Sequence, residues 1–319
     1  MSDAQRQSSF LGGLSDRVSR LEGSRAGAVA QRAYLATGRL AERAGVHLVR
    51  ASYDSPIPRR HELDAELFER DSPMRGIDWD AERQTVFLEQ RLGPFLSEFR
   101  PTEQPDAPAG VFRLGNATYD RVDAELLYGI VRFAKPARYV ELGSGYSTLV
   151  AAEALARNAA DGSAGELRCY DPYPSPHVQA RPDLASRVQP ISAERLDEAV
   201  VRELEAGDVL FVDTSHTVKL GGDVNRIVLD LLPLLTPGVL VHFHDIFFPR
   251  DYSRGHLDGG HFWTEHYLLQ AFLSGNSDWE VLVGGNAVAL HAPERLARHI
   301  PSFRPGVVPG AFWIRRTVG

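Results

Sequence analysis

From about residue 138 onward, short apolar runs alternate with longer stretches of helical spacing. Five of these runs are predicted to be strands, at 138–142, 167–170, 188–191, 208–212 and 239–243. Strands that are apolar at nearly every position are typical of parallel sheets covered by helices on both faces. Two further runs, 279–283 and 287–290, flank a Gly-Gly-Asn turn and predict a hairpin. The pattern therefore predicts an α/β fold, a doubly wound, mostly parallel, Rossmann-like sheet with an antiparallel C-terminal hairpin.

The first third of the chain predicts helices and no sheet. Apolar residues recur at helical spacing in three stretches, at Leu14, Val18 and Leu21, at 28–44 and at 80–99. Prolines impose an extended segment at 53–58. The stretch 100–110 holds three prolines and two acidic residues, which indicates a linker. We therefore divide the chain into 1–110, a helical extension that forms a cap or mediates homo-oligomerisation, and 111–319, a ligand-binding domain.

Composition narrows the class of protein and its partners. The chain is 43% apolar and 24% charged, as ordinary globular proteins are. A net charge of −7 without any long Lys/Arg run argues against a nucleic-acid partner and leaves a small molecule as the expected one. The single cysteine, Cys169, excludes an internal disulfide. No segment approaches the roughly 20 apolar residues of a membrane span, and the N-terminus lacks a signal peptide, so we expect a cytoplasmic protein.

A glycine turn joins the first predicted strand of the domain to the following helix. The turn is Gly143-Ser144-Gly145, and glycines there allow positive φ and close approach of a ligand to the backbone. A dinucleotide site would have a third glycine at position 148, which is Thr here. Glu141, just before the turn, would repel a pyrophosphate but suits a cationic ligand. The turn therefore favours a positively charged cofactor over a dinucleotide.

Acidic residues lie at three predicted strand ends. Glu141, Asp171 and Asp213 come at or near the ends of the first, second and fourth strands. Ligands of open α/β sheets bind outside the carboxyl ends of the strands, and a carboxylate there can accept both hydroxyls of a cofactor ribose. We expect the three carboxylates to lie along one edge of the sheet.

These residues resemble the class I S-adenosylmethionine-dependent methyltransferases, and among them the small-molecule O-methyltransferases of the macrocin and cephalosporin-hydroxylase-like groups. The similarity runs from about 116 to 290, and its most specific stretches are 141–147, 211–226 and 239–249. The resemblance implies that Gly143 and Gly145 line the methionine end of S-adenosylmethionine. The cofactor-binding residues it implies, together with the acids above, are Asn116, Glu141, Gly143, Ser144, Gly145, Asp171, Ser192 and Asp213.

The ends of the fourth and fifth strands hold the residues expected to act on the acceptor. His216 follows Asp213 by three residues, and we predict that it removes the acceptor's proton, with Asp213 and Asp245 as further catalytic residues. A divalent metal ion held by Asp213, His244 and Asp245 would activate the hydroxyl. Magnesium prefers oxygen ligands, whereas a bound imidazole favours manganese, iron or zinc, and both alternatives stay open. Related metal-dependent members carry an acid pair where this chain has His244-Asp245.

Other polar residues have simpler alternatives. His242 is expected to be a hydrogen-bonded core residue, and Asp223 to stabilise a helix N-terminus. His261 and Glu265 are four residues apart and could pair on a helix, while His266 stands where relatives tend to have Gln. Their roles are left open.

The expected function is O-methylation of a small secondary-metabolite or sugar-like acceptor. The alternatives are N-methylation or non-methyl-transfer chemistry at the same site, a nicotinamide-dependent oxidoreductase, and a non-catalytic binding module.

Overall fold

The computed structural model describes residues 25–49 and 51–317, which belong to two compact units that divide between Leu63 and Asp64. The first unit contains α2 (Arg25–Arg43) and the short turn η1 (Arg60–Glu62). Helix α2 confirms the helix predicted at 28–44, and the helix predicted around Leu14, Val18 and Leu21 lies outside the described residues. Homo-oligomerisation through this part of the chain stays a prediction.

The second unit begins well before the predicted linker. It includes η2 (Ala65–Phe68) and three consecutive helical segments, α3 (Ala81–Phe87), η3 (Leu88–Leu92) and α4 (Gly93–Leu96). Leu92 and Leu96 are buried, and both lie against Gly129 of α5 (Asp123–Ala134). The helix predicted at 80–99 is thus confirmed, and its apolar face packs on the body that carries the sheet.

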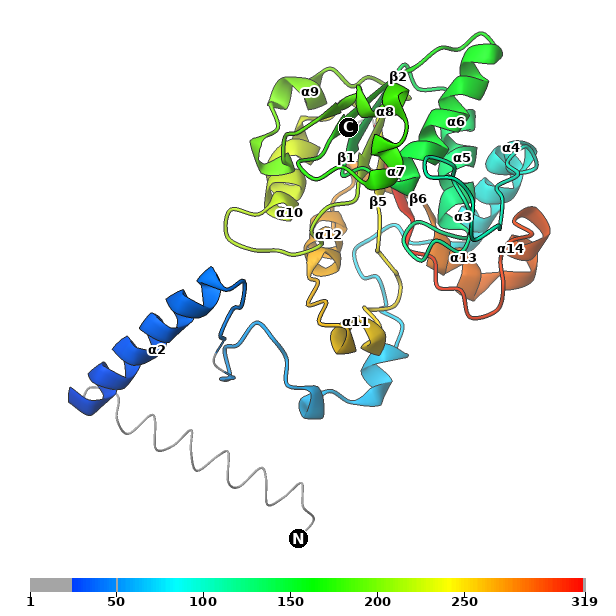
Figure 1. Cartoon of the computed structure of the whole chain (residues 1–319). Coiled ribbons are helices and arrows are strands. Elements are labelled where there is room, and N and C mark those ends of the chain that lie inside the picture. Colours follow the sequence, from blue (N-terminus) through cyan, green and yellow to red (C-terminus); the bar gives the residue numbers. More distant parts are fainter. Residues whose placement is uncertain (1–24, 50, 318–319) are drawn as a thin grey trace. The chain divides into compact units, whose positions relative to one another are not determined.

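Among the described residues, seven strands form one sheet in the order β3-β2-β1-β4-β5-β7-β6. Their bounds are β1 (Arg138–Leu142), β2 (Glu166–Tyr170), β3 (Val188–Gln189), β4 (Val209–Val212), β5 (Leu240–Phe243), β6 (Trp279–Gly284) and β7 (Phe312–Arg316). Figure 1 labels β1, β2, β5 and β6 of this sheet. Strands β1 to β5 pair in parallel, and β7 pairs antiparallel with both β5 and β6. The predicted α/β fold class, mostly parallel with an antiparallel end, is confirmed.

The predicted position of the last strand is wrong. Residues 287–290 lie in helix α13 (Gly285–His291), and β7 supplies the antiparallel partner of β6 instead. Gly284 and Gly285 therefore lead from β6 into a helix and not into a hairpin turn. The chain then passes through α14 (Pro293–His299) before β7 enters the sheet between β5 and β6.

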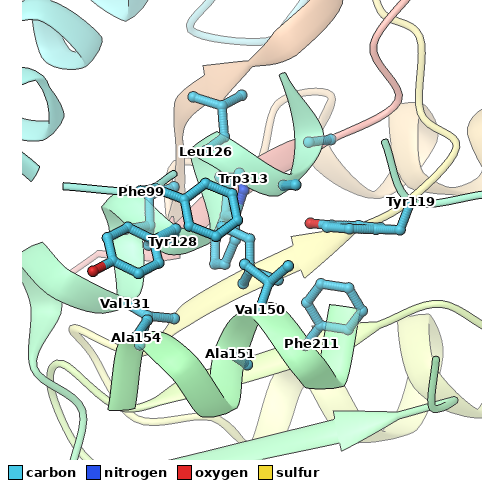
Figure 2. Packing of buried hydrophobic residues seen from close by; sticks show 14 of the residues in the cluster. Phe99, Tyr119, Leu126, Tyr128, Val131, Val150, Ala151, Ala154, Phe211 and Trp313 are labelled. Atoms are coloured by element: carbon cyan, nitrogen blue, oxygen red, sulfur yellow. The ribbon is translucent and has the colours of Figure 1, made fainter. Parts of the chain in front are cut away.

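Side chains of the parallel strands alternate between two buried clusters, one on each face of the sheet. One cluster joins α5 and α6 (Tyr146–Ala160) to Phe211 of β4 and Trp313 of β7 (Figure 2). The other joins Val140 and Leu210 to residues of the opposite layer. The remaining helical segments are α7 (Pro176–Gln179), α8 (Pro182–Ala185), η4 (Ala193–Arg195), α9 (Glu198–Arg202), α10 (Asp223–Asn225), η5 (Arg226–Leu231), η6 (Leu232–Leu234), α11 (Arg254–Asp258) and α12 (Glu265–Leu273). Burial on both faces explains why the strands are apolar at nearly every position.

Among the described residues, no helix combines the length and the apolar character needed to cross a bilayer.

Candidate active site

The glycine turn after β1 lies directly against the end of β4. Gly143 has a φ of +87°, and a Cβ atom at this position would lie 1.9 Å from the carbonyl oxygen of Asp213. The Asp213 amide donates a hydrogen bond to the carbonyl oxygen of Leu142 at 2.9 Å. Only glycine fits this approach. The turn and Asp213 therefore meet at the carboxyl edge of the sheet, as the strand-end pattern predicted.

A cavity of about 1050 Å³ opens at this edge, and we call it the first cavity. Five residues predicted to bind the cofactor contribute to its lining, namely Gly143, Ser144, Asp171, Ser192 and Asp213. Ile191 and Ala193 line it as well. A smaller cavity, of about 430 Å³, is lined by Gly145, Asn116 and again Asp213.

Asp171 connects the glycine turn to the end of β2. Its Oδ2 accepts hydrogen bonds from the backbone N–H and the hydroxyl of Ser144, both at 2.8 Å, and its Oδ1 accepts one from the Tyr173 N–H at 2.7 Å. A carboxylate offers about four acceptor positions, so one remains for a ligand hydroxyl in the cavity. Asp171 thus both shapes the first cavity and lines it.

Asn116 holds its own loop together. Its amide nitrogen donates to the carbonyl oxygens of Arg113 and Tyr119, each at 2.8 Å, and its Oδ1 accepts from the N–H groups of Thr118 and Tyr119. The side chain is therefore occupied within the loop, which leaves the shape of the loop as its contribution to the smaller cavity.

Glu141 does not reach the edge where its carboxylate was expected. Its side chain is fully buried, where Oε1 accepts a hydrogen bond from the Ser147 hydroxyl at 2.6 Å and Oε2 lies 3.4 Å from the Cys169 thiol. The position alternates with Val140 and Leu142 along β1, so the side chain points beneath the glycine turn. Burial raises the pKa of Glu141 to about 8, opposed by the hydrogen bond from Ser147. Glu141 supports the turn from below, and its buried carboxylate does not line the first cavity.

The raised pKa of Glu141 predicts a pH-dependent stability. Between pH 4.5 and about 8 the unfolded chain loses a proton that the folded chain retains, so the free energy of unfolding falls as the pH rises through this window. Glu141→Gln removes that loss. From pH 5 to pH 8.5, the free energy of unfolding of the variant should therefore rise by about 3 to 5 kcal/mol relative to that of wild type. Urea unfolding at both pH values measures it, with Glu166→Gln, an exposed residue of β2, as the control. Parallel pH profiles of wild type and Glu141→Gln would contradict the assignment.

Three groups converge at the ends of β4 and β5. One ligand-type atom each from Asp213, His216 and Asp245 lies within 4.8 Å of the others. His216 Nε2 is 3.2 Å from Asp213 Oδ1 and 3.5 Å from Asp245 Oδ2. Both His216 and Asp245 have a φ of +54°, which is uncommon for residues other than glycine and is often found at functional sites. The structure thus brings together the three residues predicted to be catalytic, and we call them the junction cluster.

His216 is held from both sides by carboxylates. Its Nδ1 is 2.9 Å from Oε2 of Glu265, the first residue of α12, whose side chain is 1% exposed. Burial alone would lower the pKa of His216, but the hydrogen bonds to Asp213 and Glu265 raise it to about 10. Without another ligand the imidazole is therefore protonated at neutral pH. The predicted role of His216 as general base, which requires a neutral ring with an open nitrogen, stays a prediction.

His244 lies beside the junction cluster without belonging to it. Its Nδ1 is 3.5 Å from Asp213 Oδ2 and 3.5 Å from Asp245 Oδ2, and its Nε2 is 3.5 Å from Asp123 Oδ2. Although burial opposes it, the charges of Asp245 and Asp213 raise the pKa of His244, and the same proximity lowers the pKa of Asp213. His244 Nδ1 is thus as close to both aspartates as His216 Nε2 is to Asp245, and a metal ion held by Asp213, His244 and Asp245 stays a prediction.

A second cavity, of about 1030 Å³, begins on the other side of the junction cluster. Asp245, His244 and Asp123 line it at the sheet edge. Its further walls combine apolar and charged side chains, among them Phe68, Phe247, Leu290, Val308, Arg121, Arg250 and Asp251. Asp213 lines the first cavity and Asp245 lines the second, so the junction cluster lies where the two spaces approach each other.

The remaining candidates have structural roles. His242 is buried and stacks on Phe211 with ring centroids 4.1 Å apart, which confirms its place in the core. Asp223 accepts hydrogen bonds from the N–H and the hydroxyl of Ser215 and so holds the loop after β4. His261 is exposed and stacks on Trp263. His266 packs against Phe248, and burial lowers its pKa to about 3.

Two partners of the cluster were not assigned from the sequence. Glu265 pairs with His216 and not with His261, and Asp123 joins His244 to the segment before β7 by accepting hydrogen bonds from the N–H groups of Gly310 and Ala311. Glu265 and His216 are 49 residues apart, and Asp123 and Gly310 are 187 apart. Sequence spacing carries no signal for pairs so distant along the chain.

Comparison with known proteins relates part of the chain to one type of domain. Residues 140–246 match the family described as "Methyltransferase domain", a range that includes the glycine turn, Asp171 and the whole junction cluster. An uncharacterized protein of Archaeoglobus fulgidus is 29% identical over 131 residues, which are 39% of this chain and 58% of that protein, so the alignment spans little more than half of this relative.

Solved structures show weak likeness. A methyltransferase of Geobacter sulfurreducens is 17% identical, with 72% of this chain and 96% of that chain covered and a TM-score of 0.37. Human N-acetylserotonin methyltransferase in complex with S-adenosylmethionine is 13% identical, with 62% and 52% covered and a TM-score of 0.33. Likeness at this level carries no information about activity. The family match stands by itself: residues 140–246 match a methyltransferase domain.

Proposed function

We propose that this protein transfers the methyl group of S-adenosylmethionine to an oxygen atom of a small molecule. The observation that carries the proposal is the position of the junction cluster between two cavities. The first cavity would hold the cofactor, because it is lined by the glycine turn and by Asp171. The second would hold the acceptor, because it is separate, of similar volume, and lined by Asp245.

The cofactor assignment is supported by the chemistry of the lining residues. Asp171 has one free acceptor position for a ribose hydroxyl, and Ser192 and Ala193 offer a half-apolar wall for the adenine ring. Gly145 has no atom within 4 Å of the position that a Cβ would take, so a ligand can approach the backbone there. The carboxylate of Asp213, beside the turn, favours a positively charged sulfonium group.

Oxygen is the acceptor atom best suited to the junction cluster. A hydroxyl must lose its proton during methyl transfer, and the enzyme has to position the acceptor and provide for that proton. Two carboxylates and an imidazole at the boundary of both cavities can do so. A divalent cation held there would lower the pKa of the hydroxyl and orient it. The match to a methyltransferase domain does not favour the alternative of a nicotinamide-dependent oxidoreductase.

The second cavity suits a secondary-metabolite or sugar-like acceptor of mixed polarity. Phe68, Phe247 and Val308 provide apolar contact area, while Arg121 and Asp251 offer polar partners. A volume near 1000 Å³ accommodates a molecule of several rings. The acidic charge of the chain argues against nucleic acid as an acceptor.

Asp171→Ala tests the assignment of the first cavity. The variant loses the ribose acceptor and releases Ser144, so the affinity for S-adenosylmethionine should fall by about 100-fold, as expected for the loss of charge-assisted hydrogen bonds worth about 2 to 3 kcal/mol. Calorimetric titration with S-adenosylmethionine measures the change.

The matched control is Asp183→Ala, which removes an exposed carboxylate paired with Arg181. This variant should bind the cofactor like wild type. Undiminished affinity in Asp171→Ala would contradict the assignment of the cavity. Formation of S-adenosylhomocysteine with a panel of glycosides, polyols and phenols then tests whether the acceptor atom is oxygen.

A further inference from the structure

We propose that Arg113 binds the carboxylate at the methionine end of S-adenosylmethionine, in the smaller cavity beside the glycine turn. This role rests on the proposed function, in which the cofactor occupies the first cavity. Arg113 comes before the first strand of the sheet and lies outside residues 140–246, which match a methyltransferase domain. The border of the two cavities, the charges around the smaller one and the fixed position of its arginine support the role.

The first cavity and the smaller cavity share two lining residues, Ser144 and Asp213. In the proposed function the ribose lies at Asp171 and the sulfonium group beside Asp213, so the methionine chain begins at this shared border. Gly145 lines the smaller cavity and has no atom within 4 Å of the position that a Cβ would take. The short carbon chain can therefore pass along the turn and bring its carboxylate into the smaller cavity.

Arg113 supplies the positive charge that a carboxylate needs there. Among the described residues that line the smaller cavity, Arg113 is the one arginine or lysine, and Asp213 is the one acidic residue. The guanidinium of Arg113 pairs with no carboxylate that the structure describes, and its Nη1 donates a hydrogen bond to the carbonyl oxygen of Gly115 at 2.9 Å. Other N–H donors of the planar group remain for a ligand carboxylate, which a guanidinium can bind through two parallel hydrogen bonds.

The loop around Arg113 fixes the guanidinium independently of a ligand. The backbone of Arg113 forms an isolated β-bridge with Thr102, and its carbonyl oxygen accepts a hydrogen bond from the side chain of Asn116 at 2.8 Å. Gly115, whose carbonyl oxygen binds the guanidinium, donates its N–H to Asp120 at 2.8 Å. A group that is already held in place loses little conformational entropy when it binds a ligand.

Tyr146 and His177 give the smaller cavity an aromatic wall. Both residues line it, and their ring centroids lie 4.2 Å apart. The Nδ1 atom of His177 is buried and has no hydrogen-bond partner among the described residues, so this nitrogen is out of reach of a ligand. An aromatic wall together with one arginine suits an aliphatic chain that ends in a carboxylate.

Lys219 and Arg195 are rival partners for the carboxylate, and both line the first cavity. Arg195 follows Ser192 and Ala193, which the proposed function places at the adenine ring, and Lys219 lies in the loop after β4. A carboxylate bound by either residue would leave the smaller cavity without a ligand group, although this cavity borders the glycine turn.

Calorimetric titration of the full-length protein with two ligands tests the role of Arg113. S-adenosylhomocysteine keeps the carboxylate of the methionine end, and its α-carboxamide replaces that charge by a neutral group of similar shape. Arg113→Gln should weaken the binding of S-adenosylhomocysteine about 10- to 100-fold and that of the carboxamide less than about threefold, because the charge-assisted hydrogen bonds exist only with the carboxylate. Arg113→Lys keeps the charge without the paired geometry, so it should restore part of the affinity.

Arg157→Gln is the matched control, because this arginine lies on the exposed end of α6 and lines neither cavity. Binding of the carboxamide also verifies that Arg113→Gln is folded; if it is not, the same comparison in Arg113→Lys decides. Wild-type affinity for S-adenosylhomocysteine in Arg113→Gln, or an equal loss for both ligands, would overturn the proposal. A loss confined to S-adenosylhomocysteine in Lys219→Gln or Arg195→Gln instead would place the carboxylate in the first cavity and overturn it as well. Wild type that binds neither ligand would contradict the proposed function itself.

Discussion

Asp245→Asn is expected to lower the rate of methyl transfer by about 10²- to 10⁴-fold, the range found when a group that handles the reacting proton is lost. Asp245 lines the acceptor cavity and contacts both His216 and His244, so its negative charge organises the junction cluster. Asn is the appropriate substitution because it keeps the shape of the side chain and tolerates the φ of +54°. An alanine at this position would add backbone strain to the loss of the carboxylate.

The affinity for S-adenosylmethionine should change by less than about threefold in this variant, because Asp245 does not line the first cavity. Single-turnover transfer from methyl-labelled cofactor, with an acceptor that wild type methylates, separates the chemical step from binding. Asp230→Asn, which removes a surface carboxylate paired with Arg226, provides the control. A rate within tenfold of wild type in Asp245→Asn would rule out a central role for the cluster.

The strand-end pattern was the most informative signal in the sequence. Asp171, Asp213 and Asp245 were predicted from their place after buried strands, and the structure places all three at the carboxyl edge of the sheet, where they line the two main cavities. The physical reason is general, because parallel strands align their carboxyl ends and side chains beyond the last pleat are free to face a ligand.

For Glu141, the position near a strand end did not predict the direction of the side chain. The residue was treated as part of the edge, although it lies within β1 and shares the parity of Tyr139, a core residue. Side chains two apart on a strand face the same way, so the alternation itself indicates that Glu141 points into the layer under α6. Here the sequence contained the signal, and the parity of the strand would have revealed it.

The end of the sheet could not be predicted in the same way. The run 287–290 is apolar and follows two glycines, which suits a strand, yet it forms helix α13 and packs against α3. Strand β7 ends in Arg315 and Arg316, which face less buried surroundings and weaken its apolar pattern. Tertiary packing decided both elements. The pairing of His216 with Glu265 was likewise hidden, since it depends on how α12 is placed beside the loop after β4.

Gly143→Ala and Gly145→Ala form a pair whose outcomes should differ. At Gly143 a methyl group would lie 1.9 Å from the Asp213 carbonyl oxygen, and the residue has a φ of +87°. Either the turn or the end of β4 must move, so we expect a loss of about 3 kcal/mol or more in the free energy of unfolding. Cofactor binding should be lost with it, because the displaced atoms border the first cavity.

Gly145 differs in both respects. Its φ of −172° is extended backbone open to any residue, and no atom lies within 4 Å of the site of a Cβ. Gly145→Ala should therefore cost less than about 1 kcal/mol, mainly through its position before α6, while its methyl group occupies space that S-adenosylmethionine would use. Urea unfolding and cofactor titration of both variants separate the two effects. If Gly145→Ala binds S-adenosylmethionine as tightly as wild type, the cofactor does not approach the backbone at this turn. The glycine turn would then be explained only by the close approach of Gly143 to the end of β4.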